Sequence, residues 1–140
     1  MCAATRDSRS ARPPAEAGSP GSHVVLIISS DAVAAALLGG LVETLGFLVR
    51  FFEAPEAVEE AIRRTRPSVA MVDCHDPTLV REDLLGRARM RGISVVIFGT
   101  PDALHRVREL AMEHQLDTLI MPVSLESLDE ALRKACGIEG

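Results

Sequence analysis

The side chains best able to take part in chemistry occupy the same kind of place in the sequence. Each comes at or directly after the end of a short apolar run. They are Ser29, Ser30, Asp31, Asp73, Thr100 and Met121. A carboxylate such as that of Asp73 can act as a nucleophile or hold a hard cation, provided that further charged groups assist it. It can also simply accept hydrogen bonds from backbone amides or from the Thr100 hydroxyl. Both interpretations of Asp73 stay open at this point.

Other forms of catalysis have little support in the sequence. Cys74 and His75 are adjacent, but the neighbouring Asp73 disfavours the thiolate that a Cys–His nucleophile needs. Neither serine after the first apolar run lies in a G-x-S-x-G turn. The loop 99–102 contains a single glycine and lacks the pattern of a phosphate-binding or dinucleotide-binding loop. We therefore predict that the protein is not an enzyme and takes no cofactor.

The elements that must position these residues alternate between two kinds of apolar pattern. Short β-branched and aliphatic runs predict strands covered on both faces, and stretches with apolar residues three and four apart predict helices. The expected strands are 24–28, 47–52, 68–72, 93–98 and 118–121, and the expected helices are 31–45, 54–64, 81–91, 102–114 and 124–136. Asp31, Asp102 and Ser124 are expected N-caps, and Gly46 is expected to end the first helix.

This alternation predicts an α/β fold: a doubly wound, parallel, five-stranded sheet in a three-layer sandwich of the flavodoxin-like kind. In such folds a ligand or reaction site lies at the carboxyl ends of the strands. The six strand-end residues are therefore expected to gather at one edge of the sheet.

Composition narrows the class further. The chain has 140 residues, 47% hydrophobic content and 3% aromatic content, with no Trp or Tyr. One domain is expected, and stacking platforms for bases or sugars are scarce. The net charge of -5 and the scattered basic residues argue against nucleic acid as a partner. The three cysteines have no C-x-x-C spacing, so neither a disulfide framework nor a structural metal is expected.

The N-terminal segment differs from the rest of the chain. Residues 1–22 are rich in Ala, Ser, Arg, Pro and Gly and predict a disordered tail, while residues 23–137 form the predicted domain. The sequence contains no secretory signal and no apolar run long enough to span a bilayer. We therefore expect a cytoplasmic location.

Four segments carry a resemblance to a known family. VVLIISSD, VAMVDCHDP, VVIFGT and TLIMPVSLESL occur in this order and at suitable spacing. Over residues 23–136 the chain resembles the receiver (CheY-like) domains of bacterial two-component response regulators. The resemblance implies that Asp73 stands at the phosphoacceptor position, followed by Pro77, that Thr100 stands at the switch position, and that Pro122 follows the fifth strand.

The departures from the family pattern concern charge. Ser29 and Ser30 stand where receivers carry an acidic pair, and Met121 stands where they carry a lysine. Thr118 replaces the aromatic switch residue on the fifth strand. Magnesium prefers several oxygen ligands, so we expect weak binding at best, with no metal ligand besides Asp73 and a more distant Asp31.

The helix expected over 31–45 is apolar almost all round, so its outer side must expose apolar atoms. Exposed apolar patches often mark partner sites. The interface candidates are Ala34, Ala35, Leu38 and Leu41. The competing surface comprises the fourth helix, the fifth strand and the fifth helix.

Two functional hypotheses follow. The preferred one is a stand-alone, atypical receiver-like module, a pseudo-receiver that acts by protein–protein interaction and independently of Asp phosphorylation. The alternative is a degenerate single-domain response regulator that takes phosphate at Asp73 from a histidine kinase. The expected partner is another signalling protein, either a histidine kinase or an output protein, and a homodimer is left open.

Overall fold

A computed structural model describes residues 19–53, 56–76 and 79–138 of the chain. Most of the predicted N-terminal tail, residues 1–18, lies outside the described residues, as does Pro77. Of the predicted tail, Pro20–Ser22 form a 3-10 turn, η3, which contacts the second strand.

The sheet has five strands, which are β1 (Val24–Ile28), β2 (Leu48–Phe51), β3 (Val69–Asp73), β4 (Ser94–Gly99) and β5 (Asp117–Ile120). Their order is β2-β1-β3-β4-β5, and every neighbouring pair is parallel. The helices are α1 (Ala32–Thr44), α2 (Val58–Thr65), α3 (Glu82–Met90), α4 (Pro101–Arg106), α5 (Arg108–Glu113) and α6 (Leu125–Cys136). The predicted doubly wound α/β fold is confirmed.

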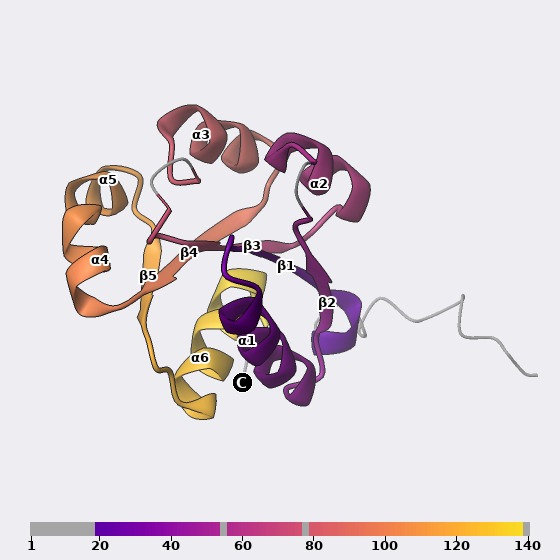
Figure 1. Cartoon of the computed structure of the whole chain (residues 1–140). Helices are drawn as coiled ribbons and strands as arrows, with labels where there is room; N and C mark the ends of the chain where they lie inside the picture. The colour runs from indigo at the N-terminus through magenta and orange to yellow at the C-terminus, as the bar shows by residue number, and fades with distance from the viewer. Residues whose placement is uncertain (1–18, 54–55, 77–78, 139–140) are drawn as a thin grey trace, which may run out of the picture.

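Helices cover both faces of the sheet (Figure 1). Helices α1 and α6 lie on one face, and α2 and α3 lie on the other, with α4 and α5 near the β5 edge. Successive strand residues point to opposite faces, so Leu26 and Ile28 of β1 join the core cluster under α2, α3 and α4. Val25 and Ile27 join the cluster under α1 and α6. The three inner strands β1, β3 and β4 are therefore largely buried on both faces, as the continuous apolar run of β1 predicted. The edge strands β2 and β5 are mostly exposed.

Local capping chemistry sets several helix ends. The Asp31 carboxylate accepts hydrogen bonds from the amides of Val33 and Ala34 at 3.0 and 3.1 Å, as predicted for an N-cap. Ser124 likewise accepts from the amide of Ser127 at 3.1 Å. Gly46 follows the end of α1 with a positive φ of 96°, a conformation that suits glycine.

Two predicted helices differ from the structure. The helix expected over 102–114 is two short helices, α4 and α5, separated at Val107, which has φ -109° and ψ 12°. Its N-cap is Thr100 and not Asp102, which lies in the first turn. The helix expected from residue 54 begins at Val58. In both cases the apolar spacing was correct, but it does not specify where the backbone leaves helical geometry.

The orientation of α1 corrects two interface candidates. Ala35 and Leu38 face the sheet and are buried, with Leu38 0% exposed, and Ala34 and Leu41 are half-buried. The exposed apolar side chains are instead Val33 and Leu37, at 70% and 68%. Periodicity could not orient this helix because nearly every position on it is apolar. Among the described residues, no helix combines the length and apolar character needed to cross a membrane.

The two adjacent glycines of α1 have different surroundings, which makes them a matched pair. A Cβ at Gly39 would lie 2.6 Å from Cζ of Phe51, whereas a Cβ at Gly40 would meet nothing within 4 Å. We expect Gly40→Ala to raise the free energy of unfolding by about 0.5–1 kcal/mol, because alanine is the better helix former. Gly39→Ala should give a smaller gain or a loss, because the Phe51 ring must move.

Urea denaturation of both variants measures this difference, and Gly39→Ala in a Phe51→Ala background should recover the helical gain. Equal stabilisation by both substitutions in the parent protein would contradict the close packing of α1 against β2.

Candidate functional site

Asp73 lies in a crevice at the carboxyl edge of the sheet. It is the last residue of β3, and its side chain is only 6% exposed. The crevice measures about 410 Å³ and is lined by Ser30, Asp31, Ala34, Asp73, His75, Asp76, Phe98 and Met121. The sequence therefore correctly predicted that Ser30, Asp31, Asp73 and Met121 come together at one edge.

Hydrogen-bond donors engage both oxygens of the Asp73 carboxylate. Ser29 Oγ donates to Oδ2 at 2.7 Å, and Ser29 is itself buried. The backbone amide of His75 donates to Oδ1 at 2.9 Å, and Nδ1 of the His75 ring lies 2.7 Å from the same oxygen. Because an ionised carboxylate only accepts, the proton of this last pair is on Nδ1.

The imidazole of His75 continues the chain of hydrogen bonds to Thr100. Its Nε2 lies 3.2 Å from Thr100 Oγ1, which also caps α4 by accepting from the amide of Ala103 at 3.4 Å. With Nδ1 protonated, Nε2 of a neutral ring accepts the hydroxyl proton of Thr100. Asp73 and Thr100, the predicted phosphoacceptor and switch positions, are thus linked through the side chain of His75.

A glycine lets this loop approach β4. A Cβ at Gly99 would collide with Sγ of Cys74 and lie 3.3 Å from Cε1 of His75. The amide of Cys74 also donates to the carbonyl of Phe98 at 3.0 Å, which holds the loop against the strand. The position of His75 between Asp73 and Thr100 therefore depends on Gly99.

The residues at the family's acidic-pair and lysine positions contribute no charge here. Ser30 is exposed and lines the crevice, while Ser29 Oγ, besides donating to Asp73, accepts from the amide of Asp31 at 3.1 Å. The Asp31 carboxylate caps α1. Met121 is half-buried in the crevice wall, and its thioether carries no charge. Among the lining residues that the structure describes, none is a lysine or an arginine.

Thr118, at the aromatic switch position, lies outside the crevice. It is exposed on β5 and lines a separate apolar groove with Ile120 of β5 and Met112 of α5. Nothing in the crevice lining therefore connects Thr118 with Asp73.

Cys74 is buried and free, and its environment opposes thiolate formation. Burial raises the pKa of the Cys74 thiol, and the charge of Asp73 raises it further. Burial also raises the pKa of Cys136, to about 11. Neither thiol has the depressed pKa of a reactive cysteine.

His75 is the site residue that sequence reasoning missed, because it was considered only as a partner for Cys74. The available signal was its spacing. A histidine two residues beyond a strand-end aspartate can fold back, so that its amide and its ring both reach the carboxylate, in the manner of an Asx turn.

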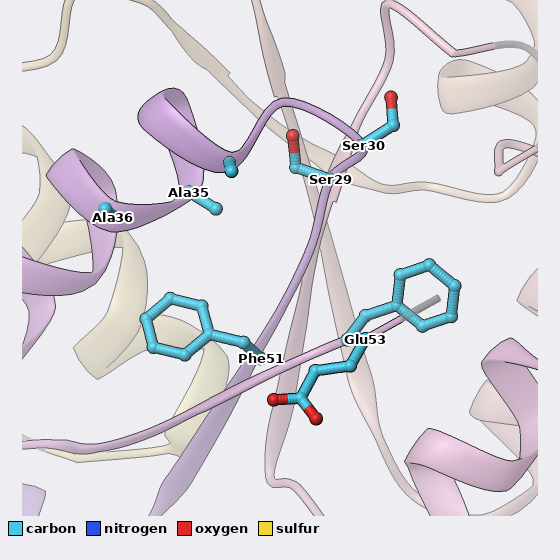
Figure 2. Close-up of a pocket in the computed structure, with 8 residues that line it drawn as sticks. Ser29, Ser30, Ala35, Ala36, Phe51 and Glu53 are labelled. Atoms are coloured by element: carbon cyan, nitrogen blue, oxygen red, sulfur yellow. The ribbon is translucent and has the colours of Figure 1, made fainter. Parts of the chain in front are cut away.

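A second hollow lies between α1 and β2 (Figure 2). Ser29 and Ser30 stand at its upper edge, Ala35 and Ala36 of α1 form one side, and the Phe51 ring lies opposite them. Ala32 and Ala36, which line the groove, directly precede the exposed Val33 and Leu37 in α1.

The hydrogen bond from Ser29 to Asp73 generates a stability prediction. Ser29→Ala removes a donor to a buried carboxylate, and we expect it to lower the free energy of unfolding by about 1.5–3 kcal/mol. Ser30→Ala is the matched control, because Ser30 is exposed; its effect should stay within about 0.5 kcal/mol. Urea denaturation at pH 7 measures both, and similar small effects would mean that Asp73 does not depend on the Ser29 hydroxyl.

Comparison with known proteins gives a likeness in structure only. No family model matches the sequence, and no curated protein matches it. A response regulator receiver protein from Burkholderia phymatum superposes with a TM-score of 0.70 at 16% identity, covering 84% of this chain and 98% of its own. An uncharacterized protein from Neptuniibacter caesariensis gives a TM-score of 0.71 at 17% identity, covering 84% and 89%.

The receiver domain of a sensor histidine kinase from Pseudomonas aeruginosa, whose structure has a magnesium ion coordinated in the active-site cleft, gives a TM-score of 0.66 at 19% identity, covering 82% of this chain and 98% of its own. At identities this low, the superpositions show a shared architecture and not a shared chemistry of the site. The strand order, the strand-end residues and these superpositions together establish that the chain has the fold of a response-regulator receiver domain.

Proposed function

We propose that this chain is a receiver-like signalling module that acts by binding another protein and does not depend on phosphorylation of Asp73. The observation that carries the proposal is the engagement of both Asp73 oxygens by Ser29 and His75. Uncharged residues at the acidic-pair and lysine positions support it.

A carboxylate attacks phosphorus with a lone pair of one oxygen, and each hydrogen bond that its oxygens accept lowers their nucleophilicity. In this crevice Oδ1 accepts from two groups of His75 and Oδ2 accepts from Ser29. A hydrogen bond to a charged group contributes about 1.5–3 kcal/mol, so attack from either oxygen starts from a stabilised ground state. The local network therefore opposes the nucleophilic role.

The described lining of the crevice contains Asp31, Asp73 and Asp76 but no lysine or arginine to neutralise a phosphoryl group. Transfer depends chiefly on positioning and on neutralising the charge of the phosphoryl oxygens. Mg²⁺ takes near-octahedral oxygen sites, commonly with carboxylates. Asp73 has both oxygens engaged and Asp31 caps α1, so these residues do not fit a magnesium site. Met121 cannot supply the charge-assisted contact of an ammonium group.

A protein partner requires a surface, and α1 offers one. Val33 and Leu37 are exposed on two successive turns, beside Ala36 and Gly40, which are also exposed. Ala36 also lines the groove of Figure 2, where Phe51 is 39% exposed. Exposed apolar side chains gathered in this way often mark interaction sites. The alternative hypothesis, a phosphorylatable single-domain response regulator, instead requires Asp73 to react.

Restoring the charges should restore the reaction. We expect no phosphoryl adduct on the parent protein after incubation with acetyl phosphate and Mg²⁺, and a clear adduct on the variant that combines Ser29→Asp, Ser30→Asp and Met121→Lys. Intact-mass spectra detect the adduct, and Asp73→Asn in the variant background should remove it. His75→Ala alone frees one oxygen without adding charge and should remain unmodified. Stoichiometric modification of the parent protein at Asp73 would overturn the proposal in favour of the phosphorylatable alternative.

Charged substitutions on α1 test the interaction surface. We expect Val33→Glu with Leu37→Glu to abolish capture of a specific partner from an extract of the native cells, while the circular dichroism spectrum stays that of the parent protein. Met90→Glu on α3 is the control, because Met90 is 89% exposed and lies on another helix. Retention of the partner by the α1 variant, with loss after Met112→Glu on α5, would assign binding to the β5 side and contradict the α1 proposal.

A further inference from the structure

We propose that Glu82, Glu113 and His114 form a binding site for a divalent first-row transition-metal ion, with zinc as the representative ion. The site joins α3 to α5 and lies outside the Asp73 crevice. It requires neither phosphorylation nor the α1 surface, so it is independent of the proposed function.

Three ligand groups from two separate elements converge at this place. Glu82 is the first residue of α3, Glu113 is the last residue of α5, and His114 follows it. One ligand atom from each lies within 4.8 Å of the other two. Because α3 and α5 are brought together only by the sheet that they cover, the cluster is a product of the fold.

His114 presents the observation that calls for a ligand. Its Nε2 atom is buried and has no hydrogen-bond partner among the described residues. Leaving a buried polar atom unsatisfied costs about 1–3 kcal/mol, and such atoms in folded proteins usually have an explanation. A metal ion bound to Nε2 would satisfy it.

The spacing fits a coordinated ion better than a hydrogen bond. Nε2 of His114 lies 3.8 Å from Oε1 of Glu82, which is too long for a hydrogen bond. Two ligands of a tetrahedral zinc ion, with bonds of about 2.0–2.2 Å, stand about 3.4 Å apart. A small rotation of the Glu82 side chain, which is 67% exposed, would close the difference.

The charges of the cluster also favour a cation. Two carboxylates converge here, and in the described part of the chain neither Glu82 nor Glu113 forms an ion pair with a lysine or an arginine. One imidazole with two carboxylates suits zinc and its first-row neighbours, whereas magnesium and calcium prefer oxygen ligands alone. Water would complete the coordination.

Binding would have a structural consequence for the β5 side. Helix α5 forms one wall of the apolar groove through Ala111 and Met112, directly before Glu113. Helix α5 is short and is separated from α4 by a break at Val107. An ion bound by residues of both α3 and α5 would hold α5 in one position.

Zinc titration of the full chain, free of any affinity tag and after chelator treatment, tests the proposal. We expect one zinc ion per chain by calorimetry and a higher melting temperature in its presence. His114→Gln and Glu113→Gln should each weaken binding about tenfold or more. The matched controls are His105→Gln and His75→Gln, each made in a Cys2→Ser background. Both should bind zinc as the parent protein does.

A second measurement identifies the ligand even if a variant is less stable. The chain has four histidines, so the ring Cε1 proton signals can be assigned with single substitutions. On addition of zinc, the His114 signal should shift or broaden first. Absence of stoichiometric binding, binding undiminished by His114→Gln, or a first response at His75 would overturn the proposal.

Discussion

The buried carboxylate of Asp73 is the constraint around which the site is organised, because a charge removed from water must be given hydrogen-bond donors. At the carboxyl edge of the sheet these donors are the Ser29 hydroxyl and the amide and ring of His75. They satisfy both oxygens of the carboxylate without a lysine or an arginine. Ser29 at an acidic-pair position is therefore a structural partner of Asp73, since an aspartate there would set two carboxylates against each other.

The same network links Asp73, the predicted phosphoacceptor position, to Thr100, the predicted switch position. Thr100 contacts His75, His75 contacts Asp73, and Gly99 leaves room for this arrangement. The receiver fold here has its central residues joined in one chain of hydrogen bonds, from Ser29 through Asp73 and His75 to Thr100. The exposed apolar side chains of α1 and the Glu82–Glu113–His114 cluster lie outside this crevice, so the two proposed binding places are separate from Asp73.

Much of the fold could be predicted from the sequence, because its signals are local. Apolar runs of β-branched residues specified the five strands, and their alternation with helical patterns specified a parallel sheet. Strand-end residues identified the edge where Asp73, Ser30 and Met121 meet. Asp31 and Ser124 identified helix starts through side-chain capping, which involves residues only two or three positions apart.

The sequence by itself thus determined the order of the strands along the chain, the edge where the strand-end residues meet and the uncharged side chains of Ser29, Ser30 and Met121 at that edge, since each depends on residue types at short spacing. Only the tertiary structure decided how α1 is rotated, because a helix that is apolar all round has no preferred face until the sheet provides one. It also decided that His75 bridges Asp73 and Thr100, and that Glu82 meets His114. The contacts of His75 with Thr100 and of Glu82 with His114 join residues far apart in the chain, and their distances depend on how strands, loops and helices pack together.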